Sequence, residues 1–63
     1  MTPNLIKEHD IVTSTIPFEK IPIGTKGTVV HCYEEVGAFE VEFINKDGKS
    51  EIKTLLNIQI KKK

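Results

Sequence analysis

The stretch Ile21–Phe43, IPIGTKGTVVHCYEEVGAFEVEF, carries the strongest structural pattern in this sequence of 63 residues. In its last part, AFEVEF, three large apolar side chains alternate with Glu40 and Glu42. Alternation with a period of two is typical of a strand with one buried and one solvated face, whereas a helix would scatter the glutamates. The stretch therefore predicts strands over 27–33 and 38–44, joined by a short hairpin loop, Glu34–Gly37.

The hydrophobic pattern also predicts how the two strands pair. Antiparallel counting from the loop gives four cross-strand pairs: Tyr33–Ala38, Cys32–Phe39, His31–Glu40 and Val30–Val41. A slip of one residue would turn the phenylalanines into water, so the pattern favours this register.

Three further strands are expected outside the hairpin. Residues 10–16 are rich in β-branched side chains, and Pro17–Thr25 reads as a long loop because it contains two prolines and a glycine. The turn Asn45–Gly48 leads into a strand over 51–55. There Ile52 is expected opposite Phe43 and Lys53 opposite Glu42.

The C-terminal part is expected to hold a kink and a last short strand. LLN, residues 55–57, offers a single turn before IQIK, in which Ile58 and Ile60 are expected to face inward. Lys61, Lys62 and Lys63 are expected to form a frayed, basic end.

Together these elements predict an all-β fold, a small five-stranded SH3-like barrel built as an antiparallel meander. The expected organisation is an irregular lead-in over 1–9, the barrel over 10–61 and a basic end at 62–63. The expected core consists of Val30, Phe39, Val41, Phe43 and Ile52.

Composition limits the function classes. Nine lysines balance nine acidic residues, and arginine is absent. Nucleic-acid binders usually show a basic surface and use arginine on phosphates and guanine, so the balance disfavours that class. A single cysteine favours the cytosol, because small exported domains usually carry several. Neither an export signal nor an apolar run long enough to span a bilayer is visible.

The sequence resembles a family of small bacterial proteins known only as a domain of unknown function. The resemblance covers residues 10–60 and rests on a G-x-x-G-T-V-V entry, a Y-E-V-E-F strand and a D-G-x-T-x-x-x-L strand. The matching positions are Gly24, Gly27, Thr28, Val29, Val30, Tyr33, Glu40, Val41, Glu42, Phe43, Asp47, Gly48 and Leu55. Phe39 and Ser50 depart from the tyrosine and threonine common there. The resemblance implies a single SH3-like barrel and assigns no activity.

The glycines are interpreted as structural. Gly24, Gly27 and Gly48 lie at predicted turns, and the run after Gly24 lacks the spacing and the following helix of a phosphate-binding loop. The same G-x-x-G-x-V spacing resembles the turn of KOW-type barrels, some of which contact RNA. Weak RNA or DNA binding therefore remains an alternative, with phosphate contacts expected from a set of lysines: Lys20, Lys26, Lys61, Lys62 and Lys63.

No catalytic residue, metal site or cofactor is expected. His31 and Cys32 are neighbours on a strand, so their side chains point to opposite faces and cannot share a metal without distortion. Cys32 is expected in the core, and His31 beside Glu40 on the solvated face. No carboxylate pair or serine–histidine–acid set is apparent.

A protein-binding role is the remaining interpretation. Phe18 lies in the long loop and Tyr33 at the hairpin end, with His31 nearby, and long loops of SH3-like barrels often border partner-binding grooves. Alternatively, Phe18 folds back and plugs the open end of the barrel. The expected function is a non-enzymatic interaction module, an accessory or regulatory partner of another protein. An antitoxin that neutralises a toxin partner is a further alternative, without residue-level support.

Overall fold

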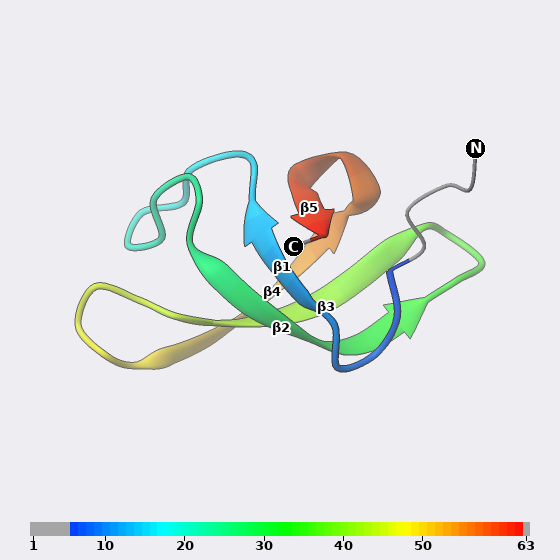
Figure 1. Ribbon diagram of the computed structural model, residues 1–63, viewed down its shortest axis with the longest axis horizontal. Helices are drawn as coiled ribbons and strands as arrows, with labels where there is room; N and C mark the ends of the chain where they lie inside the picture. Colours follow the sequence, from blue (N-terminus) through cyan, green and yellow to red (C-terminus); the bar gives the residue numbers. More distant parts are fainter. Residues whose placement is uncertain (1–5, 63) are drawn as a thin grey trace.

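The computed structural model describes residues 6–62 and contains one antiparallel sheet of five strands (Figure 1). The strands are β1 (Ile11–Ser14), β2 (Lys26–Tyr33), β3 (Ala38–Ile44), β4 (Ser50–Leu56) and β5 (Ile60–Lys62). A single 3-10 turn, η1 (Asn57–Gln59), separates β4 from β5. The all-β prediction is confirmed.

The strand order is β4-β3-β2-β1-β5, so β1 to β4 form a meander and β5 returns to pair with β1. This order is compatible with an SH3-like barrel. The barrel is not closed, because β4 and β5 are the two outer strands of the sheet and do not pair with each other.

The core lies on the inner face of the curved sheet, and every strand contributes to it. Phe43, Val41, Val29 and Val12 are fully buried, and Leu55 and Ile60 almost so. Ile21, from the loop between β1 and β2, is also fully buried. The sheet therefore curls around one cluster, to which Ile6, Phe18, Cys32 and Phe39 are added as partly buried members.

The β2–β3 hairpin keeps the predicted register at its loop end and departs from it further along. Tyr33–Ala38, Cys32–Phe39 and His31–Glu40 pair as predicted. The predicted pair Val30–Val41 is wrong: Val41 pairs with Val29, and the register shifts between Val29 and His31. Val30 is the additional residue of a β-bulge and is exposed, so it does not belong to the core.

The predicted register of β4 is also wrong, by one residue. Glu42 pairs with Ile52, Val41 with Lys53 and Phe43 with Glu51, so Ile52 lies on the outer face and is 59% exposed.

The turn before β4 explains this shift. The Asn45 side-chain oxygen accepts hydrogen bonds from the backbone N–H groups of Asp47 and Lys49, at 2.8 and 3.1 Å. The Asn45 backbone N–H donates to the Lys49 carbonyl at 2.8 Å. The turn thus includes Lys49 and extends one residue beyond the predicted Gly48.

At the C terminus the predicted kink exists, but η1 contains Ile58, which is 81% exposed rather than inward-facing. Ile60 is buried as predicted. Lys61 and Lys62 are not frayed, because they pair with Thr13 and Val12 within β5. Lys63 and residues 1–5 of the predicted lead-in lie outside the described residues.

The predicted structural role of the three glycines fits their geometry. Gly24 and Gly48 have φ angles of 88° and 78°, a region that favours glycine. Gly27 is needed for space, since a Cβ there would lie 2.6 Å from Cγ1 of Val41. The chain after Gly24 continues directly into β2, so a strand follows this turn.

Candidate functional site

A shallow groove of about 760 Å³ crosses the outer side of the sheet near the start of β2. It is lined by residues from the segment before β1 and from β1, β2, β3 and β5: His9, Asp10, Ile11, Lys26, Gly27, Thr28, Glu42, Ile44 and Lys62. The register explains its floor, because Ile11, Thr28 and Glu42 are direct neighbours across three strands. Pairing of distant segments therefore creates the groove.

The groove combines apolar surface with both signs of charge. Ile11 is 43% and Ile44 57% exposed, although both are large aliphatic side chains. Lys26 and Glu42 supply a cation and an anion in the same lining. The lining therefore offers aliphatic surface together with both signs of charge.

Asp10 anchors one wall of the groove. Its Oδ2 accepts a hydrogen bond from the backbone N–H of Lys7 at 2.9 Å and lies 3.5 Å from Nζ of Lys62. The Lys7 hydrogen bond, helped by the nearby Lys62 charge, lowers the pKa of Asp10 below its ordinary value. The contact ties the segment before β1 to β5.

Two predicted binding residues, His31 and Tyr33, lie together at the other end of the hairpin. Their rings meet edge to face, with centroids 4.5 Å apart. The Tyr33 hydroxyl is hydrogen-bonded to the carboxylate of Glu40, which raises the pKa of Tyr33. His31 lies across from Glu40, as predicted, and its Nδ1 is 3.5 Å from Oε2 of Glu8.

The third predicted binding residue, Phe18, is separate from this pair. It packs, partly buried, against the core and forms an isolated bridge with Ile21. Nζ of Lys53 lies 5.7 Å from the centroid of its ring. These contacts agree with the alternative in which Phe18 plugs the open side of the barrel.

The lysines expected to contact phosphate divide into two groups. Lys26 and Lys61 both pair with Thr13, from opposite sides, so they flank it in one row across β2, β1 and β5. Lys62 follows Lys61 and lines the groove. Lys20 lies elsewhere, on the long loop, where its Nζ is 2.9 Å from Oδ2 of Asp47. Lys63 is outside the described residues.

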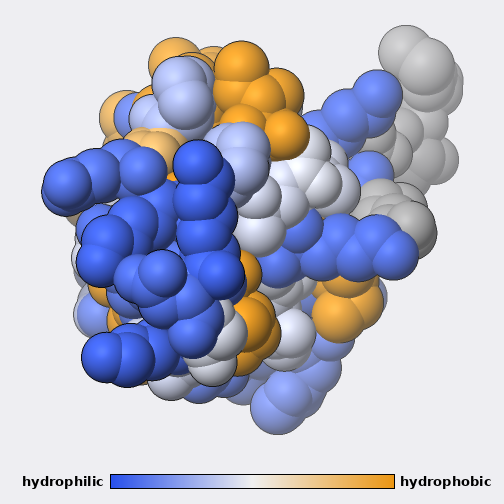
Figure 2. Space-filling model, turned by 90° about the vertical axis from the view of Figure 1, so that its left-hand side faces the viewer, coloured by the Kyte–Doolittle hydropathy of each residue, from blue (hydrophilic) through white to orange (hydrophobic). Residues whose placement is uncertain are grey.

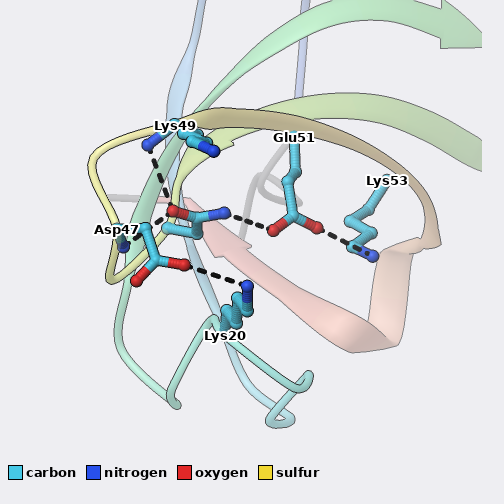
Figure 3. Close-up of polar contacts among 6 residues, drawn as sticks. Lys20, Asp47, Lys49, Glu51 and Lys53 are labelled. Atoms are coloured by element: carbon cyan, nitrogen blue, oxygen red, sulfur yellow. Dashed lines mark hydrogen bonds and ion pairs between the residues drawn. The ribbon is translucent and has the colours of Figure 1, made fainter.

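A polar network that the sequence interpretation missed joins the long loop to the β3–β4 turn (Figure 3). The Asn45 side-chain amide donates to Oε2 of Glu51, whose Oε1 lies 3.2 Å from Nζ of Lys53. Beside it, the Lys20–Asp47 ion pair and a hydrogen bond from the Lys46 N–H to the Lys20 carbonyl connect the two loops. The asparagine that opens NKDGK was the sequence signal, since this residue type caps tight turns.

Figure 2 shows the side of the molecule on which these two loops lie. Hydrophilic side chains cover most of its front, and apolar surface emerges above and beside them. Lys20 and Asp47 have about half of their side-chain surfaces in water, and such exposed ion pairs contribute little stability.

The remaining reactive side chain, Cys32, is not activated. Burial, and next the negative charge of Glu8, raise the pKa of its thiol above the ordinary value. Its Sγ is 3.8 Å from the carbonyl oxygen of Ile6, and it pairs with Phe39 on the inner face while His31 points outward. Within residues 6–62, no three His, Cys, Asp or Glu side chains are grouped as metal ligands.

Comparison with known families matches residues 8–61 to the family described as Domain of unknown function (DUF4926). No curated protein and no solved structure matches the chain. Over the part of the chain that the structure describes, no helix is long and apolar enough to cross a membrane.

Proposed function

This chain belongs to the DUF4926 family, and we propose that it is a small non-enzymatic interaction module of the bacterial cytosol that binds another protein. In this role it is an accessory or regulatory subunit rather than the active component. The groove on the outer face is the proposed binding surface.

The exposure of Ile11 and Ile44 within one groove carries this proposal. They line this groove together with Lys26 and Glu42, so one surface offers aliphatic side chains and both signs of charge. Protein interfaces combine an apolar centre with a polar rim in this manner. The bound partner is therefore a protein segment that inserts apolar side chains between Ile11 and Ile44 and presents complementary charges to Lys26 and Glu42.

The chemistry of the side chains supports a non-enzymatic role. The thiol of Cys32 and the hydroxyl of Tyr33 both have a raised pKa, which disfavours their nucleophilic forms. Asp10, the carboxylate in the groove with an altered pKa, is shifted towards stronger acidity and is already engaged by Lys7 and Lys62. A general base would need the opposite shift.

Site-specific photo-crosslinking in the cells that encode the protein tests the proposal. A photoreactive phenylalanine at Ile44 is expected to give one crosslinked product of defined mass. The same group at Ile58, which is exposed but lies outside the groove, is the matched control and is expected to give none. Equal products at both positions, or none at Ile44, would contradict the proposal.

The crosslinked product identifies the partner, whose affinity for the protein can then be measured directly. With the partner identified by mass spectrometry and purified, Glu42→Lys is expected to weaken binding at least tenfold, because it reverses the charge of a side chain that lines the groove. Unchanged affinity would show that the partner binds elsewhere.

A second candidate function, weak nucleic-acid binding, is favoured by one observation. The fold brings Lys26 of β2 to one side of β1 and Lys61 and Lys62 of β5 to the other, although Lys26 is far from the other two in sequence. An amide NMR titration with mixed-sequence single-stranded RNA distinguishes the candidates. Shifts at these lysines that fade with added salt would favour phosphate contacts, and an unchanged spectrum at low salt would exclude them.

A further inference from the structure

Among residues 6–62, strand β4 forms one outer edge of the sheet and is paired only on the side of β3. Its backbone orientation follows from the hydrogen bond that Asn45 donates to Lys49. Because hydrogen-bonded and non-hydrogen-bonded pairs alternate in an antiparallel ladder, Phe43–Glu51 and Val41–Lys53 are the next hydrogen-bonded pairs. The intervening Ser50, Ile52 and Thr54 therefore turn their N–H and C=O groups towards the free edge.

This edge differs from the other one in length and sequence. The opposite edge, β5, has three residues, two of them lysines, which is a common protection against unwanted pairing. β4 has seven residues and no proline, and it exposes 59% of Ile52 and 49% of Leu56. The longer edge is thus the one able to accept another strand.

The sequence of β4 is complementary to itself when a second copy runs antiparallel about an axis at Ile52. Ile52 then lies opposite Ile52 of the other copy, and Ser50 opposite Thr54, through the backbone groups that face the edge. On the inner face, Glu51 lies opposite Lys53 of the other copy, twice. Opposite charges and aliphatic pairs in directly facing positions stabilise antiparallel strands.

Neighbouring registers are disfavoured by the same residues. An axis at Lys53 places two lysines directly opposite each other, and an axis at Glu51 does the same with two glutamates. Like charges in facing positions destabilise a strand pair. Glu51 and Lys53 keep about a third of their side-chain surface exposed, so both are accessible to a second copy.

We propose that the protein forms a homodimer in which two β4 strands pair antiparallel about Ile52, joining the two sheets into one. The interface uses main-chain hydrogen bonds for affinity and the Glu51–Lys53 pairs for register. It lies at the sheet edge, beside the groove assigned to a protein partner, and does not depend on that assignment.

A mixing experiment with two charge variants tests the register. In the Glu51→Lys variant, residues 51 and 53 are both lysine, and in Lys53→Glu both are glutamate. Because residue 51 of one copy faces residue 53 of the other, two copies of the same variant repel each other at both of these contacts. A mixed pair restores attraction at both. Sedimentation velocity up to about 1 mM protein is expected to show a wild-type dimer, at least a tenfold higher dissociation constant for each variant alone, and recovery in the equimolar mixture.

The mixture also separates the interface from folding, because each variant loses its internal Glu51–Lys53 pair whether or not it is mixed. Circular dichroism is expected to show that both variants remain folded. A wild-type monomer throughout the concentration range, or a mixture no more dimeric than its components, would overturn the proposal. If wild type and both variants form the same assembly larger than a dimer, the strands pair as β4 with β5. That result would also overturn the proposed β4–β4 dimer.

Oxidative crosslinking provides an independent measurement. Residues in a hydrogen-bonded antiparallel pair have Cα atoms about 5.5 Å apart, which is within disulfide range. In a Cys32→Ser background, Ile52→Cys is expected to form a covalent dimer under mild oxidation, and Ile58→Cys, the exposed control on η1, is expected to form far less. Equal crosslinking at both positions would contradict an axis at Ile52.

Discussion

Gly27 lies directly opposite Phe43, and the phenylalanine ring packs into the space that a side chain at this glycine would occupy. A Cβ at Gly27 would be 2.8 Å from Cδ1 of Phe43 and 2.6 Å from Cγ1 of Val41. Both neighbours are fully buried, so neither can move into solvent. The glycine that opens the first strand of the predicted hairpin is therefore required by packing.

Gly27→Ala is expected to destabilise the fold by about 1–3 kcal/mol, the usual cost of overpacking a dense core. Urea unfolding followed by circular dichroism measures the loss. In the double variant with Phe43→Leu, which removes the crowded ring edge, the loss should be smaller than the sum of the two single losses. Additive losses would show that the ring does not limit this position.

Ile58 and Ile60 form a matched pair for the C-terminal strand, since they are identical side chains two residues apart. Ile60→Ala should cost about 2–5 kcal/mol because the side chain is 5% exposed in the core. Ile58→Ala should stay within about 0.5 kcal/mol, as for an ordinary surface position. Thermal unfolding of both variants checks the difference, and similar losses would contradict the placement of η1.

Acid should destabilise the protein through Glu51 as well as Asp10. The Asn45 amide and then Lys53 lower the pKa of Glu51 below its ordinary value. A carboxyl whose pKa is lowered by folding stabilises the fold above its unfolded pKa, and this contribution is lost as the pH falls through the folded pKa. The loss is expected below about pH 4.

Denaturant unfolding of wild type and Glu51→Gln between pH 6 and 3 provides the measurement. The variant should be less stable than wild type at pH 6, and the two should converge towards pH 3. Glu35→Gln, in the exposed β2–β3 turn, controls for the loss of one negative charge. Parallel curves for wild type and Glu51→Gln would show that the Asn45 contact has no effect on titration.

Cys32 should react slowly with thiol reagents in the native state. Burial raises its pKa, so less thiolate is present at neutral pH than in a free thiol. Alkylation with iodoacetamide should be at least several-fold slower than in urea-unfolded protein at pH 7.5, and it should accelerate as the pH rises. A native rate equal to the unfolded rate would show that the thiol is open to solvent.

The register of the β2–β3 hairpin was predicted correctly where the hydrophobic pattern is compatible with only one pairing of the strands. Near the four-residue loop only one register buries Cys32 and Phe39 on the same face, and the structure has that register. The predicted register was wrong at Val29 and Val30. Two adjacent valines fit the alternating pattern equally well, and no neighbouring residue indicates which of them a β-bulge leaves outside the core. The expected core therefore contained Val30 where the structure buries Val29.

The phase of β4 failed for a related reason. The segment SEIKTLL alternates in both phases, with Ile52 and Leu56 in one and Leu55 in the other. The more apolar phase was expected inside, but the Asn45 turn fixes the register and turns Ile52 outward. The candidate groove was missed because it depends on the pairing of Ile11 with Thr28 and of β5 with β1, which are contacts distant in sequence.

The pairing of β1 with β5 also affects the rate at which the chain folds. Val12 lies beside Lys62, so the strand formed by the first part of the chain completes its hydrogen bonding only with residues from the last part. Contacts of such wide sequence separation must close a large loop before they gain any stability, which slows folding. The domain should therefore fold in milliseconds to seconds, and β5 should be the element that opens first in hydrogen exchange.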